Sequence, residues 1–201
     1  MHPLHILPIA SLTAAIAQAP NFAITAKLSS SSSLIAIQGW NLTHYHFGAC
    51  YNYAVFTSGT GRTFYANGTA DEFSTHTSNL LSDDGSPFLP WGLIVSAPNA
   101  TDNQGRRNVY INCGPGTSGV QVKTDGSFPM MGKGPRVVYG TGEFYVCKSN
   151  FVYGLAIALY YREAGEETPA RCSNVELQTQ CLDDRTEHPY QQDSWCYKSL
   201  E

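Results

Sequence analysis

Charged residues are scarce in this chain, and basic residues do not cluster anywhere along it. The 201 residues include 12 Lys and Arg and 16 Asp and Glu, so 14% are charged and the formal net charge is -4. Soluble domains more often contain about 25% charged residues. Because phosphate groups and anionic lipids are bound by clusters of Lys and Arg, this composition argues against nucleic acid and membrane surfaces as partners. The length allows one domain with a substantial buried core.

Several catalytic and cofactor motifs are missing as well. The sequence has no C-x-x-C, no G-x-x-x-x-G-K-[ST] and no G-x-S-x-G, which argues against a thioredoxin-type site, a phosphate-binding loop and a serine-hydrolase elbow. GPGTSG, Gly114 to Gly119, matches G-x-G-x-x-G, but a strand pattern follows it where a dinucleotide site needs a helix. We therefore expect no nucleotide and no other cofactor.

A membrane-spanning run is also missing, but the first residues have the pattern of a signal peptide. MHPLHILPIASLTAAIAQAP contains an apolar stretch that is too short for a bilayer, and it places Ala15 and Ala17 at the A-x-A spacing that signal peptidases accept. We predict a signal peptide at 1–17, a single β-rich domain at 18–180 and an irregular extension at 181–201 that its cysteines tie down. The protein is expected to be secreted and extracellular, and its oligomeric state stays open.

Six cysteines and three glycosylation sequons agree with export. An even number of cysteines without C-x-x-C spacing favours structural disulfides over a zinc site. The pairs that we propose as a hypothesis are Cys147 with Cys172, Cys181 with Cys196, and Cys50 with Cys113. A link between Cys50 and Cys147 would contradict this scheme. The acceptor residues of the N-x-[ST] sequons are Asn41, Asn67 and Asn99.

Short segments of strand pattern, separated by turn residues, make up most of the chain. In NFAITAKLSS, residues 21–30, apolar side chains alternate with small or polar ones, which is the period of two expected of a half-buried strand. Turn signals such as SGTG, NGT, GPGTSG and GTG separate further segments of this kind. We predict an all-β fold, a β-sandwich or partly open barrel of short antiparallel strands, stabilised by disulfides and with at most one short helix.

Three segments give more specific expectations. SLIAIQGW, residues 33–40, is predicted to be an apolar strand. FVYGLAIALYY, residues 151–161, is apolar on both faces and is predicted to be a central strand covered on both sides. Thr69 and Glu72 match the capping box T-x-x-E, which predicts a short helix after Thr69.

HYHFGACYNYAVF, residues 44–56, combines histidines with aromatic residues. His44 and His46 stand at i and i+2, so both rings project from one face of a strand, as in a two-histidine metal pair. The alternative is that they form the solvated face of the strand, with Tyr45 and Phe47 on a buried face. In the second arrangement the segment is a strand anchored by Cys50 and carries no metal site.

Tyrosines on predicted strands form a second group of candidates. A tyrosine ring exposed on a sheet can stack on the apolar face of a sugar or on a partner side chain, although tyrosine is also a good strand former. The candidate ligand-binding residues are Tyr45, Tyr51, Tyr53 and Tyr65. Glu143 is the acidic residue on a predicted strand that would suit glycoside hydrolysis, a reaction that needs two carboxylates.

GEFYVCKSNFVYGLAIALYYREAGEETPARCSNVEL, residues 142–177, resembles a family of small secreted proteins of filamentous fungi with an uncharacterised domain. Residues 144–147 (FYVC) and 169–172 (PARC) carry the resemblance, together with GACYNYAVF and TFYANGT. The second cysteine that this family usually has shortly after Cys50 is absent here, which leaves the partner of Cys50 open. The resemblance implies a secreted, β-rich fungal fold and supplies no activity.

These features favour a secreted, non-enzymatic, effector-like glycoprotein that binds a glycan or a protein at a cell surface or in a host. A secreted glycoside hydrolase that uses Glu143 is the alternative. A structural cell-wall protein or antigen is a further one.

Overall fold

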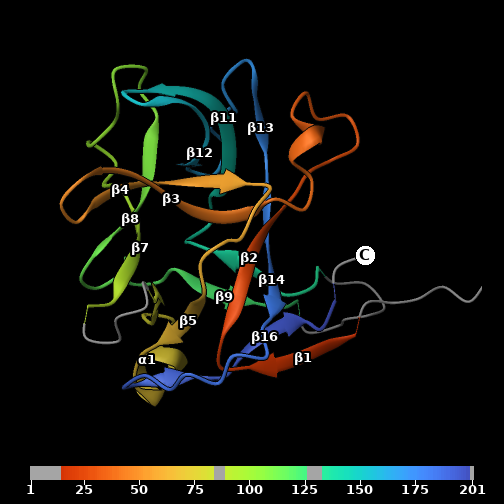
Figure 1. Ribbon diagram of the computed structural model, residues 1–201, viewed down its shortest axis with the longest axis vertical. Coiled ribbons are helices and arrows are strands. Elements are labelled where there is room, and N and C mark those ends of the chain that lie inside the picture. The colour runs from red at the N-terminus through yellow and green to blue at the C-terminus, as the bar shows by residue number, and fades with distance from the viewer. Residues whose placement is uncertain (1–14, 84–88, 126–132, 200–201) are drawn as a thin grey trace, which may run out of the picture.

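The computed structural model describes residues 15–83, 89–125 and 133–199, and β-strands dominate these ranges (Figure 1). The strands are β1 (Ile16–Ala19), β2 (Phe22–Lys27), β3 (Asn41–Gly48), β4 (Tyr51–Thr57), β5 (Phe64–Asn67), β6 (Asn79–Ser82), β7 (Trp91–Val95), β8 (Arg107–Cys113), β9 (Gln121–Lys123), β10 (Arg136–Val138), β11 (Glu143–Phe151), β12 (Gly154–Arg162), β13 (Cys172–Asn174), β14 (Glu176–Cys181), β15 (Gln191–Gln192) and β16 (Ser194–Tyr197). One α-helix, α1 (Ala70–Ser74), and one 3-10 helix, η1 (Ile35–Ile37), complete the described elements. The predicted all-β class is confirmed.

Eight strands close into a barrel. They follow one another in the order β2-β3-β4-β12-β8-β7-β6-β5, and β5 pairs back with β2 where Phe64 lies opposite Phe22. Every pair in this ring is antiparallel. The predicted sandwich and the partly open barrel are therefore replaced by a closed barrel, in which no strand of the ring is left as an edge.

Apolar side chains from several strands fill the interior of the barrel. Phe22, Ile24 and Ala26 of β2 belong to the main core, as do Leu42 of β3 and Phe56 of β4, and each is at most 4% exposed. A second, smaller cluster lies on the other face of β4 and β12. It contains Val55, Tyr145, Cys147, Ala158 and Tyr160, and it includes residues of the additional strand β11, which pairs with β12 and β13.

One disulfide holds a turn of the barrel, and two join additional strands to one another. The three disulfides join Cys50 to Cys113, Cys147 to Cys172 and Cys181 to Cys196, which are the pairs proposed from the sequence. The first disulfide links the turn between β3 and β4 to the end of β8, the second joins β11 to β13, and the third joins β14 to β16.

The predicted helix is present and is capped as expected. The Thr69 hydroxyl accepts a hydrogen bond from the Glu72 amide, and the Glu72 carboxylate accepts one from the Thr69 amide at 2.7 Å. These two bonds satisfy amides that have no partner inside the helix. The hydrogen bond that the Thr69 amide donates to the Glu72 carboxylate holds the pKa of that carboxyl below its usual range. Within the described ranges no helix is long and apolar enough to cross a membrane.

The predicted strand over residues 33–40 is wrong, because this segment forms η1 instead. Leu34, Ile37 and Trp40 all pack against the main core, and their spacing of three residues is the period of a 3-10 helix. Gly39, at φ 76°, then donates its amide to the Ala26 carbonyl and returns the chain to the barrel. The apolar content was recognised in the sequence, but its period was misread.

The predicted central strand over residues 151–161 is confirmed from Gly154 onward, because β12 lies between β11 on one side and β4 and β8 on the other, but its predicted start is wrong. Phe151 ends β11 and Gly154 begins β12, so Val152 and Tyr153 form the turn of a β-hairpin. The side chains at this tip are largely in solvent, with Val152 73%, Tyr153 76% and Leu155 61% exposed. Neither turn residue is Asn, Asp, Gly or Pro, so the sequence pattern did not predict a turn here.

Residues 181–201 are not irregular as predicted, because β15 and β16 lie within them. The strand β16 pairs with β1 and β14, and Cys196 in β16 is fully buried. Most of the predicted signal peptide, residues 1–14, lies outside the described residues. Ile16 and Ala17 pair with Tyr197 and Cys196, so cleavage after Ala17, which stays a prediction, would shorten β1 to two residues.

Candidate functional site

Aromatic side chains gather on the outer face of three neighbouring barrel strands. Tyr45 on β3 lies opposite Tyr53 on β4, and Tyr53 lies opposite Tyr110 on β8. Two rings from the β11–β12 hairpin join this row. We call the whole set the aromatic surface, and its members are Tyr45, Phe47, Tyr51, Tyr53, Tyr110, Phe151 and Tyr153.

Tyr53 lies at the centre of the aromatic surface. Its ring centroid is 4.5 Å from that of Phe151, 5.2 Å from that of Tyr110 and 5.9 Å from that of Tyr51. Phe47 packs edge-on against Tyr53 with 5.7 Å between the centroids. Such contacts restrict each ring, and tilted or edge-to-face pairs add about 0.5–1.5 kcal/mol beyond the buried area.

The hairpin tip is fastened to the barrel through Tyr45. The amide of Tyr153 donates a hydrogen bond of 2.7 Å to the Tyr45 hydroxyl, and the Phe151 ring lies 4.8 Å from the Tyr45 ring. The Tyr153 ring is stacked over Tyr45 at 6.4 Å with 27° between the planes. Tyr153 is therefore both the most exposed ring of the surface and one with a defined position.

Three rings of the aromatic surface are open to solvent: Phe47 is 43% exposed, Tyr51 37% and Tyr153 76%. None of the seven members carries a charge at neutral pH. Burial, followed by the hydrogen bond with Tyr110, raises the pKa of Tyr51 well above its usual range, so its hydroxyl stays protonated. The surface thus presents neutral rings with apolar faces and hydroxyl edges.

Cys50 positions Tyr51 in this arrangement. The turn between β3 and β4 consists of Ala49 and Cys50, and Cys50 adopts φ 57°, a conformation that L-residues rarely occupy. The disulfide to Cys113 holds the turn against the end of β8. Phe47 and Tyr51 flank this turn, so their placement depends on the disulfide.

Tyr65, the fourth predicted tyrosine, lies elsewhere. It is on β5, only 3% exposed, and its ring stacks on His188 with 4.0 Å between the centroids. Burial, with a contribution from Asp83, raises the pKa of Tyr65 to about 12. Its role is to pack the C-terminal segment against the barrel, whereas Phe47, Tyr110, Phe151 and Tyr153 are the members that the sequence did not single out.

The two histidines of β3 differ in exposure. His44 is half-buried on the face of the completely buried Leu42, whereas His46 is exposed. Phe47 is exposed, so the expectation that it is buried is wrong, while the expectation of a solvated histidine holds at His46. Aromatic or histidine side chains occupy both faces of this strand, so alternation alone could not say which face points inward.

Both imidazole rings contact neighbouring side chains. Nδ1 of His44 lies 2.8 Å from a guanidinium nitrogen of Arg62, and Nδ1 of His46 lies 3.1 Å from the Asn52 side-chain oxygen. Among the described residues, no three His, Cys, Asp or Glu side chains come together as a metal site would require. The metal hypothesis for His44 and His46 thus has no third ligand in the described part of the chain.

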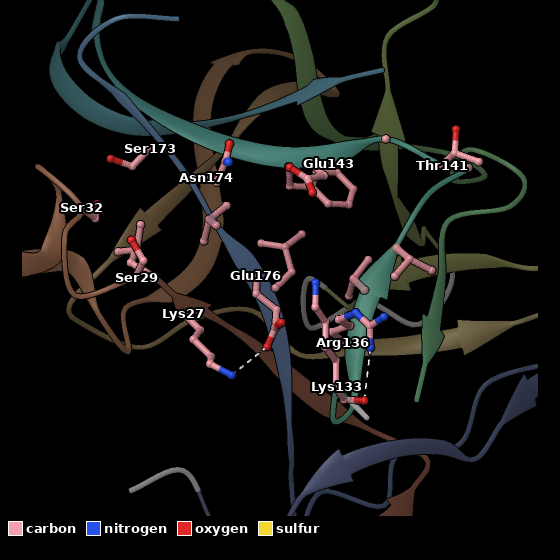
Figure 2. A pocket seen from close by; sticks show the side chains of 18 residues that line it. Lys27, Ser29, Ser32, Lys133, Arg136, Thr141, Glu143, Ser173, Asn174 and Glu176 are labelled. Carbon is pink, nitrogen blue, oxygen red and sulfur yellow. Dashed lines mark hydrogen bonds and ion pairs between the residues drawn. The ribbon is translucent and has the colours of Figure 1, made fainter. Parts of the chain in front are cut away.

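A cavity of about 690 Å³ lies between β2, β10, β11 and the β13–β14 segment (Figure 2). Buried apolar side chains form its floor, namely Leu28, Val137, Phe144, Val175 and Leu177. Figure 2 shows Glu143 and Asn174 on one side of the opening and Lys27, Glu176 and Arg136 on the other.

Glu143 shares this cavity with a second carboxylate, that of Glu176. Each is paired with a cation: Glu143 with Arg162, and Glu176 with Lys27 at 3.1 Å. Glycoside hydrolysis uses a pair of carboxylates, and each of these two is held in an ion pair.

The three sequon asparagines differ in their surroundings. The side-chain amide of Asn41 donates to the Gly59 carbonyl at 2.9 Å, and that of Asn67 donates to the Pro189 carbonyl at 2.8 Å. Asn99 is exposed in the loop between β7 and β8, with no side-chain hydrogen bond to a described residue. A glycan on Asn99 disturbs no contact of the described structure.

We therefore expect Asn99 to be the most fully glycosylated of the three sites in protein secreted from a eukaryotic host. Glycopeptide mass spectrometry measures the occupancy of each site, and Asn99→Gln serves as the matched control that should remove one glycan mass. Full occupancy of Asn41 or Asn67 with Asn99 unmodified would contradict this expectation.

Comparisons with known proteins agree with an uncharacterised fungal family. A family model described as a domain of unknown function, DUF7907, matches residues 19–181, which include the aromatic surface and the whole cavity lining. An antigenic protein, SchS34, from Stachybotrys chartarum is 36% identical over 87 residues, which cover 43% of this chain and 38% of that relative. The match thus spans well under half of the curated relative. No solved structure matches. The resemblance seen in the sequence is confirmed, and the chain belongs to the DUF7907 family.

Proposed function

We propose that this protein is a non-enzymatic binding protein that acts outside the cell, and that its aromatic surface binds a neutral polysaccharide. The observation that carries the proposal is that Phe47, Tyr51 and Tyr153 are exposed on one surface while a network of half-buried rings holds them. The three disulfides and the name of the antigenic relative are consistent with an extracellular location.

The chemistry of the surface favours an uncharged sugar polymer. The C–H faces of pyranose rings stack on aromatic rings, and the tyrosine hydroxyls accept or donate hydrogen bonds at the ring edges. A polymer presents the same unit repeatedly, so several exposed rings bind one chain and their weak contacts combine. The seven rings carry no charge that would select an anionic polymer.

We expect the secreted protein to be retained on at least one of insoluble chitin, β-glucan and xylan. Tyr51→Ala and Tyr153→Ala are each expected to weaken retention roughly 3- to 10-fold, the loss of one aromatic contact. Tyr190→Ala is the matched control, since Tyr190 is 69% exposed but lies in the turn before β15, outside the aromatic surface.

Absence of retention on all three polymers would reject the polysaccharide proposal. Equal retention of Tyr51→Ala, Tyr153→Ala and Tyr190→Ala would reject the aromatic surface as the site. Binding of a purified extracellular protein that Tyr153→Ala abolishes, without binding of any polymer, would replace the polysaccharide by a protein partner.

A glycoside hydrolase is the second candidate, and one observation favours it: Glu143 and Glu176 line the same cavity. Release of reducing ends from soluble glucan, xylan or chitin oligosaccharides, lost in Glu143→Gln, would establish it. A structural wall protein or antigen is a third proposal, supported by the name of the relative, and it predicts no saturable binding to any of these polymers.

A further inference from the structure

We propose that the cavity in Figure 2 is a second binding site, separate from the aromatic surface, and that it takes a soluble, uncharged oligosaccharide. This inference goes beyond the proposed function and does not depend on it, because the two sites share no residue.

The volume of the cavity and its apolar floor are typical of a ligand-binding site. Its volume of about 690 Å³ lies within the range of roughly 300–1,000 Å³ that is usual for small-molecule pockets. The floor residues Leu28, Val137, Phe144 and Leu177 belong to β2, β10, β11 and β14 or their ends, and each is at most 8% exposed. Because core packing fixes these side chains, the cavity keeps its shape without a ligand.

The rim supplies both donors and acceptors. Ser29, Ser32, Thr141 and Ser173 line the cavity, together with Asn174, whose side-chain oxygen accepts a hydrogen bond from the Thr168 hydroxyl. A sugar hydroxyl donates one hydrogen bond and accepts others, so it needs such a mixed set of partners. An apolar floor below a polar rim matches a pyranose ring, which has apolar faces and a hydroxylated edge.

The charges of the rim are largely neutralised by ion pairs. Lys27 is paired with Glu176, Arg136 with Asp125 at 2.9 Å, and Glu143 with Arg162. Of the rim cations, Lys133 forms no ion pair with a described residue. A phosphate or carboxylate ligand would require an uncompensated basic cluster, which this rim does not present.

The paired carboxylates keep acceptor oxygens available. Glu143 contacts Arg162 through Oε2, and Glu176 contacts Lys27 through Oε1. No described residue donates a hydrogen bond to the other oxygen of either side chain. Each free oxygen can accept from a sugar hydroxyl, and such charge-assisted bonds are roughly twice as strong as neutral ones.

The strand β11 separates the two sites. Glu143 at its start lines the cavity, and Phe151 at its end belongs to the aromatic surface. At about 3.4 Å per residue these two positions are up to about 27 Å apart, too far for one monosaccharide to contact both. Variants at one site therefore leave the other intact.

The test is a titration of the full secreted protein, labelled with nitrogen-15, with chitotriose, laminaritriose and xylotriose. We expect one trisaccharide to shift the amide resonances of Thr141, Ser173 and Asn174 in a saturable manner. Asn174→Ala and Glu176→Gln should each weaken its binding roughly tenfold, the loss of one strong hydrogen bond, while Tyr190→Ala, outside both sites, leaves it unchanged. Thermal melting of each variant shows whether it is folded.

Three outcomes would overturn the proposal. The first is that no trisaccharide binds, and the second is that the shifts are confined to the aromatic surface. The third is tighter binding of glucuronate or inorganic phosphate than of any trisaccharide, which would identify an anion site. Retention on insoluble polymers and its loss in Tyr153→Ala are measured separately, so failure of the cavity proposal is distinguishable from failure of the proposed function.

Discussion

Replacing Cys50 and Cys113 together by Ala is expected to lower the free energy of unfolding by roughly 4 kcal/mol and to weaken binding at the aromatic surface. The disulfide closes a loop with a sequence separation of 63 residues, and the chain-entropy model assigns such a loop about this stabilisation. It also holds the β3–β4 turn, where Cys50 adopts φ 57° next to Tyr51. Loosening this turn frees the Phe47 and Tyr51 rings, so binding should fall with stability.

The matched control is the double substitution of Cys181 and Cys196 by Ala. This disulfide closes a shorter loop, with a separation of 15, and joins β14 to β16, away from the aromatic surface. Its removal should lower the free energy of unfolding by roughly 3 kcal/mol and leave polymer retention unchanged. Guanidinium unfolding and the retention assay, both on protein that is still folded at the assay temperature, measure the two effects. Equal losses of retention in both double variants would contradict the positioning role of the Cys50–Cys113 disulfide.

Arg107→Ala is expected to lower the free energy of unfolding by about 2–3 kcal/mol, because it leaves the buried Ser96 carbonyl without its donors. The Arg107 side chain on β8 is 7% exposed, and its Nε and Nη2 donate to the Ser96 carbonyl at 3.0 and 2.8 Å. Nη1 pairs with Glu163, and the guanidinium lies 4.9 Å from the centre of the Tyr161 ring. Truncation leaves the Ser96 carbonyl without these donors and Glu163 without its partner.

Two comparison variants test this expectation. Arg107→Lys keeps the charge but lacks the planar guanidinium fork that bonds the Ser96 carbonyl through two nitrogens and Glu163 through the third, so an intermediate loss is expected. Lys27→Ala removes a cation that is 49% exposed and ion-paired with Glu176, and it should cost no more than about 1 kcal/mol. Denaturant unfolding of the three variants provides the comparison. A loss in Arg107→Ala as small as that in Lys27→Ala would show that the buried network does not stabilise the fold.

Features that depend on neighbouring residues were predictable. The period of two over Phe22–Lys27 is the strand β2, and the T-x-x-E box at Thr69 caps α1. The proposed pairs Cys147–Cys172 and Cys181–Cys196 were correct, and their partners are 25 and 15 residues apart. In each case the residues that determine the structure are close along the chain, so the physical rule can be read from the sequence.

The candidate sites were only partly predictable. Tyr45, Tyr51 and Tyr53 were identified because tyrosine on a strand is a recognisable pattern. The apolar turn at Val152 and Tyr153 was missed, and with it the most exposed ring of the aromatic surface. Glu143 was identified, but the sequence did not indicate that Glu176 and Lys27 face the same cavity.

The sequence by itself determined the class of this protein: many short strands, one capped helix, an even set of cysteines and strand tyrosines. Only the tertiary structure decided that β5 pairs with β2 and closes the barrel, and that His44 points inward while Phe47 points outward on the same strand. Alternation of side chains defines the two faces of a strand, but it does not show which face is buried when both faces carry aromatic or histidine rings. That choice depends on which distant strands pair, because burial is shared among residues far apart in the chain.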